Sequence, residues 1–451
     1  VEAAKAYADA GADPLFAARL HALQRAAGQF LRSGYMDEGL AIAKQVLGEV
    51  GLKWHENSTS ALISLLIRRT WLRLRGLTFT EKNPAVIPQA QRIKMDALWS
   101  LGHGLGGVDT VRGAEFHIRH LHLALQAGDP YRIGRGLAWE SILNAAEGGV
   151  GGRRRGRTQA AAGHALAKRL NNDHAAAWSW AAEGYNNWCD GRWNDALACS
   201  EKAAKGYREE CLDITWEIGS VYAWCWGPVL CYSGRLTELR QLITQVEREF
   251  GQLGDLYTLV TLRTVVTPWL TLADGEPERA RQESADAVAK WSKKHWHLQH
   301  LFDRMTDARV ALYQGDGARA ADLMESGWPR FTATMQNLLQ TKRMFMHGLR
   351  GQAVIMAVMQ GKRPVSSLKI ADADAKRLRK EGTAWATSYA IHLSAALNLA
   401  RGNTNAAIVD YRTSVAAFDA LNMPLHAAAA RIRLGQAAND DAELHAGIAA
   451  L

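Results

Sequence analysis

A glycine-centred turn recurs along this chain at a nearly constant interval, and no other feature of the sequence restricts the fold as strongly. The first copy is SGYMDE at residues 33–38. From the second copy onward the glycines lie 43, 41, 40, 46 and 41 residues apart, at Gly191, Gly234, Gly275, Gly315, Gly361 and Gly402. A glycine accepts the positive φ that closes a helix, and the polar residues after it can start the next helix. The spacing therefore predicts repeated helix–turn–helix units.

The residues after these turns have the apolar periodicity of helices. Three stretches show it as steps of mostly three or four residues. They are Leu236, Leu239, Ile243, Val246 and Phe250; Ile408, Tyr411, Val415, Phe418 and Leu421; and Leu40, Ala43, Leu47 and Val50. Such spacing places one apolar stripe along a helix, which must be buried against a neighbour.

A helical hairpin repeated at a fixed period is typical of stacked repeat arrays. We therefore expect an all-α fold, a TPR-like α-solenoid of stacked helical hairpins. The period of 40–46 residues exceeds the 34 of an ideal TPR, although small and aromatic residues such as Ala196, Ala203 and Tyr207 keep a TPR-like pattern. The chain has only ten prolines, which fits the helical interpretation.

The run EGGVGGRRRGR at 147–157 predicts a break, because four glycines within five residues disfavour a helix. We divide the chain there into an N-terminal helical repeat region at 1–146, a Gly/Arg-rich linker or loop at 147–157, and a TPR-like array at 158–451. One continuous array across this point is the alternative.

Charge and cysteine content bear on partners and compartment. The formal net charge is +9, with small basic clusters at 68–75 and 153–157, so nucleic acid is a possible but secondary partner. The five cysteines show no CxxC spacing, which favours a reducing cytoplasm over a disulfide framework. The uncharged run at 218–234 is shorter than the roughly 20 residues of a spanning helix, so no membrane span is expected.

Two sequence patterns resemble parts of a nucleotide site or a metal site, but the residues that such sites also need are missing around them. Residues 102–107 match GxGxxG, but no strand precedes them, and a helix-breaking turn is the simpler interpretation. Histidines cluster at 117–122 and at 295–300 without a carboxylate or thiolate that completes a metal site. We also find no GxxxxGK[ST], HRD, DFG, GxSxG or HExxH sequence. We therefore predict no catalytic residues, cofactor or metal.

Tryptophan is abundant, with 16 residues, and it clusters at 178–193 and 216–226. Packing between helices explains such clusters; an aromatic groove that holds a peptide or an apolar ligand is the functional alternative. Under that alternative the candidate interaction groove consists of Trp180, Asn186, Asn187, Trp188, Arg192, Trp224, His297 and His300.

Long stretches of mixed composition resemble the C-terminal region of large bacterial Ser/Thr protein kinases of the planctomycete and myxobacterial type. The stretches that carry the resemblance are residues 31–52, 108–140, 211–224, 254–264, 287–320 and 377–386. In that family a kinase domain is followed by an AAA/STAND-like ATPase module and a TPR-like tail. The resemblance implies that both modules lie before Val1 and that none of their catalytic residues is in this chain.

The resulting hypothesis is a non-catalytic regulatory region of a cytoplasmic signalling kinase, which binds a protein or peptide partner and the N-terminal modules of its own chain. The tail of a STAND-type transcriptional regulator or adenylate cyclase is one alternative. A basic helical-repeat protein associated with nucleic acid is another. A stand-alone enzyme with an unfamiliar site among the Trp and His clusters is a third.

Overall fold

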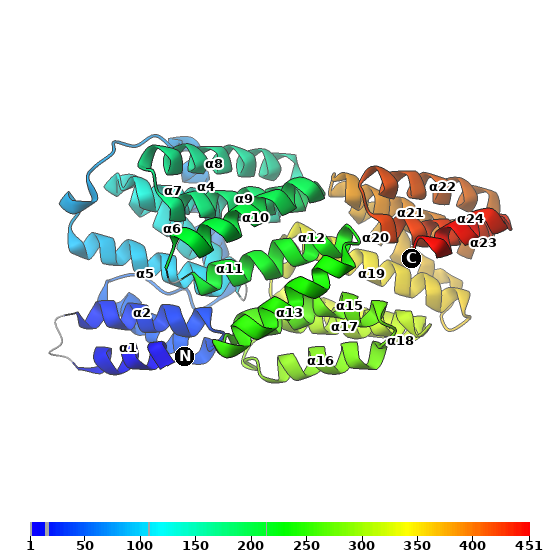
Figure 1. Cartoon of the computed structure of the whole chain (residues 1–451), viewed down its shortest axis with the longest axis horizontal. Helices are drawn as coiled ribbons and strands as arrows, with labels where there is room; N and C mark the ends of the chain where they lie inside the picture. The colour runs from blue at the N-terminus through cyan, green and yellow to red at the C-terminus, as the bar shows by residue number, and fades with distance from the viewer. Residues whose placement is uncertain (1, 14–17, 107–108, 213) are drawn as a thin grey trace.

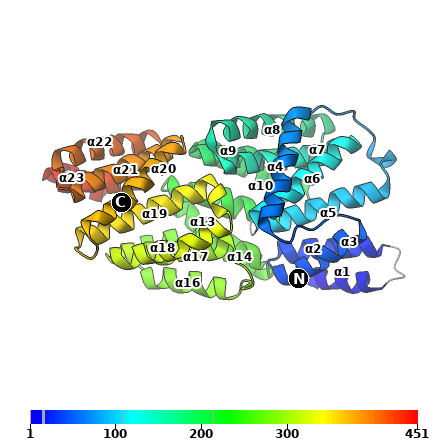
Figure 2. The same ribbon diagram turned by 180° about the vertical axis from the view of Figure 1, so that it is seen from behind.

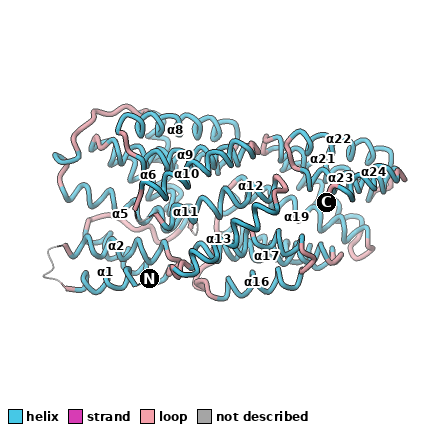
Figure 3. The backbone as a smooth tube through the Cα atoms, viewed as in Figure 1, coloured by secondary structure: helices cyan, strands magenta, loops and turns pink. Residues whose placement is uncertain are grey.

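The structure, a computed structural model, describes residues 2–13, 18–106, 109–212 and 214–451, and the regular secondary structure in these ranges is helical. No strand occurs in these ranges (Figure 3). Figures 1 and 2 show an elongated molecule, with α1–α10 toward one end and α20–α24 at the other. The prediction of an all-α fold is confirmed.

The first part of the chain contains long helices joined by short turns. They are α1 (Glu2–Ala12), α2 (Arg19–Arg32), α3 (Met36–Glu49), α4 (Ser58–Arg75), η1 (Pro84–Val86), α5 (Gln89–Gly106), α6 (Thr110–Ala127), α7 (Pro130–Glu147), α8 (Gly149–Leu170), α9 (Asp173–Asp190) and α10 (Trp193–Glu210).

The second part follows the same plan with some shorter elements. They are α11 (Thr215–Val221), η2 (Tyr222–Trp226), α12 (Gly227–Tyr232), α13 (Leu236–Gln252), α14 (Leu256–Val265), α15 (Thr267–Ala273), α16 (Pro277–Ala289), α17 (Leu298–Tyr313), α18 (Gly317–Ala333), η3 (Gln336–Leu338), α19 (Gln340–Met359), η4 (Val365–Ser367), α20 (Leu368–Lys380), α21 (Ala384–Ala400), α22 (Thr404–Ala420), α23 (Pro424–Ala438) and α24 (Asp441–Ala449).

The glycine turns lie where the periodicity places them. All seven predicted turn glycines have positive φ, from 67° to 88°. A non-glycine residue is strained in that conformation, which explains why glycine recurs at these positions. The helices that follow bury the expected stripes, with Leu239, Val246 and Phe250 inaccessible to solvent. Most consecutive helices pack against each other in sequence order, as stacked helices do, whereas α4 packs against α6.

The loop expected over residues 147–157 is wrong, because α8 begins at Gly149 and continues through the whole basic run. The glycines allow close packing that offsets their poor helix propensity. A Cβ at Gly156 would lie 2.4 Å from Asn186 Oδ1, and one at Gly152 would lie 2.7 Å from the Asn144 carbonyl oxygen. These glycines thus let α8 approach α7 and α9. The domain division at this point stays a prediction.

Segments far apart in the sequence also contact each other, beyond the neighbour-to-neighbour packing of an open array. The indole N–H of Trp385 in α21 donates to the Cys189 carbonyl oxygen of α9 at 3.0 Å. Arg343 of α19 donates to the Glu147 carbonyl oxygen at 3.1 Å. At the start of α14, the Leu256 N–H donates to the carbonyl oxygen of Ser33, which follows α2, at 3.1 Å. The first two contacts fasten α21 and α19 to α9 and α7, and the third joins α14 to the turn between α2 and α3.

The main apolar core is continuous from Ala27 to Leu434. Among the described residues, Leu256–Ala273 is apolar and long enough to cross a membrane by length and composition alone. This stretch comprises α14 and α15, and 61% of it is buried inside the molecule. Packing in the core therefore accounts for its apolar character.

Candidate functional site

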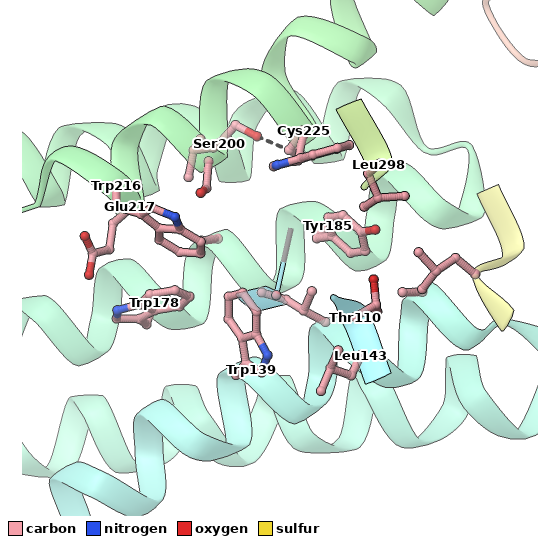
Figure 4. Close-up of a pocket in the computed structure, with 18 of the residues that line it drawn as sticks. Thr110, Trp139, Leu143, Trp178, Tyr185, Ser200, Trp216, Glu217, Cys225 and Leu298 are labelled. Atoms are coloured by element: carbon pink, nitrogen blue, oxygen red, sulfur yellow. Dashed lines mark hydrogen bonds between the residues drawn. The ribbon is translucent and has the colours of Figure 1, made fainter. Parts of the chain in front are cut away.

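An aromatic cavity lies in the interior where helices from distant parts of the sequence meet (Figure 4). Its volume is about 110 Å³. The principal side chains of its wall come from α7, α9, α11, η2, α14, α17 and α19, and they include Trp139, Trp178, Tyr185, Trp216, Glu217, Trp224, Tyr257, Leu298 and Lys342. A concave apolar site with few polar groups is the usual form of a small-ligand site.

The rings of the wall pack against one another and hold its shape. Trp139 meets Trp178 edge-on at 5.6 Å between ring centroids, and Trp216 stacks on Tyr257 at 5.7 Å. The Trp224 indole N–H donates to the Tyr257 hydroxyl at 2.8 Å. Edge-to-face and offset contacts of this kind add to the stability from burial. The cavity is therefore bounded by side chains that are already locked in place.

Trp224 reaches the cavity from a local irregularity in the backbone. Residues Tyr222–Trp226 form one π-helical turn between α11 and α12. The inserted residue of a π-turn rotates the register of the following side chains, and such turns often mark functional sites. Pro228 follows inside the continuous helical stretch 215–232, where its missing N–H removes one backbone hydrogen bond next to the π-turn. The π-turn thus directs Trp224 and Cys225 into the wall.

One cation is buried in this aromatic wall. Lys342 is 2% exposed, and its ammonium lies 4.7 Å from the Trp224 ring centroid and 4.8 Å from that of Phe302. Among the described residues, no carboxylate lies within ion-pair distance of it. Burial lowers the pKa of Lys342 to about 7, because desolvation penalises the charged form.

A small void, the neck, lies between the cavity and a wider groove. The neck has a volume of about 20 Å³ and shares Trp224 and Lys342 with the cavity. Arg309 also lines the neck, and it lines the groove as well. The groove has a volume of about 520 Å³ and an aromatic wall that includes Tyr232, Trp269, Phe345, Trp385 and Tyr389. Shared wall residues therefore place the groove, the neck and the cavity next to one another.

The asparagines expected to bind a peptide are instead buried and bonded inside the molecule. Asn186 donates to the Ser141 hydroxyl at 2.8 Å and to the Ala182 carbonyl oxygen at 2.7 Å. Asn187 donates to the Cys199 sulfur at 3.6 Å and accepts from Arg192. Their amides therefore join α7, α9 and α10, and only Arg192 is exposed.

The remaining residues of the interaction groove predicted from the sequence do not form one surface. Trp188 and Trp224 both line the neck. Trp180 lies apart, with His164 at 4.5 Å and Lys202 at 4.2 Å from its ring. His297 accepts from the Trp291 indole N–H at 2.8 Å, and His300 accepts from the His297 backbone N–H at 3.1 Å. These two histidines therefore cap the start of α17.

The other sequence patterns have structural roles. Gly102, Gly104 and Gly106 lie within α5, so the expected helix-breaking turn is wrong for them; Gly107 is outside the described residues. A Cβ at Gly104 would lie 2.3 Å from Leu31 Cβ, which shows that these glycines allow close helix packing. Within the described part of the chain, no group of three or more His, Cys, Asp or Glu side chains could hold a metal ion.

The basic clusters are largely engaged in ion pairs. Arg69 is buried and lies 2.8 Å from Glu140. In α8, Arg153 lies 3.6 Å from Asp190 and Arg155 lies 3.7 Å from Glu147. Guanidinium groups held in this way are less available to phosphates than a free basic surface would be.

An exposed apolar stripe runs along α4. Its large side chains are 40–84% exposed and recur at helical spacing, at Ile63, Leu66, Ile67, Trp71 and Leu74. The opposite face of α4 buries Leu65 and Leu72, and α4 packs against α6. A contiguous exposed apolar surface on a folded helix is typical of an interaction site.

Comparison with known proteins leaves the family open. No protein-family model matches the chain, and a search of curated proteins found no significant match. The resemblance to kinase-associated tails therefore stays a prediction.

Neither Lys342 nor Arg309 was predicted as a site residue from the sequence, although one signal was available for Lys342. It occupies the same helical register as Phe345, Met346 and Leu349, all apolar and at least partly buried. A lysine on an apolar stripe is unusual, because a buried charge needs compensation. No comparable pattern marks Arg309, which approaches the neck from a different helix.

Proposed function

We propose that this chain is a non-catalytic regulatory interaction module, a TPR-like α-solenoid that binds a protein partner through the apolar stripe on α4. The exposure of five large apolar side chains in one helical register is the observation that carries the proposal. A soluble protein rarely leaves such a stripe uncovered unless it is used. Membership of a bacterial signalling kinase is part of the proposal and rests on the sequence resemblance.

The composition of the stripe specifies the partner's surface. The apolar centre, with Trp71 as the aromatic residue, fits an apolar groove or helix face. Arg73 and Arg75 are in the last turn of the same helix. A partner with an apolar strip bordered by carboxylates matches this arrangement in shape and charge.

The test is recovery of partners from a bacterial lysate by the whole chain and by two variants. Ile67→Glu combined with Leu74→Glu places two charges on the stripe. Val409→Glu, at a 60% exposed position on α22, is the matched control. We expect wild type and Val409→Glu to recover the same protein at moderate salt and the double variant to lose it. Equal recovery by all three would contradict the proposal.

Elution in rising salt distinguishes binding of nucleic acid from binding of a protein partner. Phosphate contacts weaken steeply with salt, because binding releases counterions. An apolar interface retains its partner over the same range. Recovery of nucleic acid alone, lost at modest salt, would contradict the proposed function and favour nucleic-acid binding. Turnover of a substrate by the purified chain would contradict the statement that the module is non-catalytic.

A further inference from the structure

Two cations without carboxylate partners line the neck between the cavity and the groove. Lys342 and Arg309 both contribute to its wall. Within the described ranges, neither lies within ion-pair distance of an Asp or Glu. Glu217 lines the cavity but not the neck. Positive charge thus collects at one narrow point between two spaces with mainly aromatic and aliphatic walls.

Aromatic rings compensate these charges only in part. Lys342 lies within 6.0 Å of four ring centroids, and Arg309 lies 5.8 Å from that of Trp269. A ring face attracts a cation through its quadrupole, but it carries no net charge. A buried ammonium is best stabilised by an anion that also accepts its hydrogen bonds. The neck therefore has the chemistry of an anion site.

The cavity beside the neck limits the size and polarity of the chemical group that is attached to the bound anion. Its volume is about 110 Å³ and its wall is dominated by Trp, Tyr, Leu and Ala side chains. A dry apolar cavity of about 150 Å³ holds benzene, so this one accommodates an aliphatic chain of roughly four or five carbons. A peptide backbone would bring several amides that need hydrogen-bond partners into this wall.

We propose that groove, neck and cavity form a binding site for a small apolar carboxylic acid, whose carboxylate pairs with Lys342 and Arg309 while its alkyl chain occupies the aromatic cavity. This site is independent of the stripe on α4, so either assignment can fail without the other. The lowered pKa of Lys342 agrees with a cation that lacks its counterion.

The test is isothermal titration of the whole chain with pentanoate at low chloride. Pentanamide and 1-pentanol serve as neutral analogues, and octanoate as an oversized one. We expect pentanoate to bind at least tenfold more tightly than any of the three. Equal affinity for pentanoate and pentanamide would refute the ion pair. Equal affinity for pentanoate and octanoate, or a site that takes chloride as tightly as pentanoate, would refute the role of the cavity.

Variants assign the site to its residues. Lys342→Met and Arg309→Met should each weaken pentanoate binding at least tenfold, whereas Lys362→Met, at an exposed turn position, should leave it unchanged. Unaltered binding in Lys342→Met would overturn the proposal. Thermal unfolding without ligand shows that this variant is folded, and we expect its Tm to rise because an uncompensated buried charge is removed.

The pH dependence provides a separate readout. Only the protonated amine pairs with a carboxylate, and the pKa of Lys342 is about 7. Pentanoate affinity should therefore fall by about tenfold per pH unit above pH 7. Lys342→Met should lose this dependence. A wild-type affinity that is constant between pH 6 and 9 would contradict the assignment of the cation.

Discussion

At the scale of single residues, burial determines which ionisable groups have strongly shifted pKa values. Asp255 caps α14 by accepting the Thr258 backbone N–H at 2.8 Å, yet its side chain is buried. Burial raises the pKa of Asp255 to about 6, because desolvation outweighs the hydrogen bonds that favour the charged form. Ionisation of this buried carboxyl therefore costs folding free energy, although the side chain still caps the helix.

Replacing this carboxyl by an amide should stabilise the protein at neutral pH. Asparagine caps helices as well as aspartate does. The folded state binds the Asp255 proton more tightly than the unfolded state, so stability from this group is present below about pH 4 and lost as pH rises through 6. We expect Asp255→Asn to raise the free energy of unfolding by about 1–3 kcal/mol at pH 7.

Urea unfolding at pH 7 and pH 4.5 measures this effect. The gain should shrink at the lower pH, where Asp255 is largely protonated in the folded state. Asp255→Ala is the control, because it removes the cap and should be less stable than Asp255→Asn by about 1 kcal/mol. A gain that is the same at both pH values would exclude ionisation as its cause.

At the scale of elements, glycine has two opposite roles in this chain. At positions such as Gly191 it has positive φ and ends a helix. In α8 it lies inside the helix, where its missing side chain admits the neighbours. The carbonyl oxygen of Gly156 accepts from Ser141, whose hydroxyl accepts from Asn186. These buried bonds tie α7, α8 and α9 together at their closest approach.

Two alanine substitutions in α8 should have opposite effects. A Cβ at Gly156 would meet Asn186 Oδ1 at 2.4 Å and the Ser141 carbonyl oxygen at 3.1 Å, so Gly156→Ala should destabilise by about 1–3 kcal/mol. A Cβ at Gly151 would meet only the flexible end of Arg155 at 3.1 Å. Gly151→Ala should therefore stabilise by up to about 1 kcal/mol through helix propensity.

Thermal and urea unfolding of the two variants provide the check, each against wild type. Loss of stability in both would indicate that Gly151 also lies at a tight contact. A neutral Gly156→Ala would show that α8 can shift away from α9 without loss of stability.

At the scale of the whole molecule, buried neutral histidines make the fold sensitive to acid. Burial lowers the pKa of both His297 and His426 to about 3. His297 accepts from Trp291, and His426 bonds to the Tyr389 hydroxyl at 2.6 Å, so each ring is used in its neutral form. Protonation is therefore disfavoured in the folded state.

Stability should fall as pH decreases below about 6.5. The unfolded state takes up protons at the ordinary histidine pKa, whereas the folded state does so only near 3. Each of the two histidines then contributes about 1.4 kcal/mol per pH unit to the slope within this window. His426→Gln should reduce the slope by that amount. Urea midpoints between pH 7.5 and 4.5 that do not change would contradict this account.

The sequence predicted the elements better than it predicted the site. A turn glycine such as Gly234 acts through its own backbone angle, and the stripe of α13 shows its period within the helix, so both are local signals. Gly156 was misjudged because its packing partners lie on α7 and α9. The cavity has no local signal, since Trp139, Tyr257 and Lys342 meet only after distant helices pack together.

The hydrogen bond between Trp385 and Cys189 has a consequence for the covalent chain itself. The turn at Gly361 and Lys362 is exposed and presents a site for trypsin. Beyond it, α20 and α21 remain fastened to earlier helices through Trp385 and through Glu381, which pairs with Arg343. We expect a chain nicked after Lys362 to elute as one particle under native conditions and as two fragments in denaturant. Peptide continuity at this turn would then be dispensable once the fold has formed.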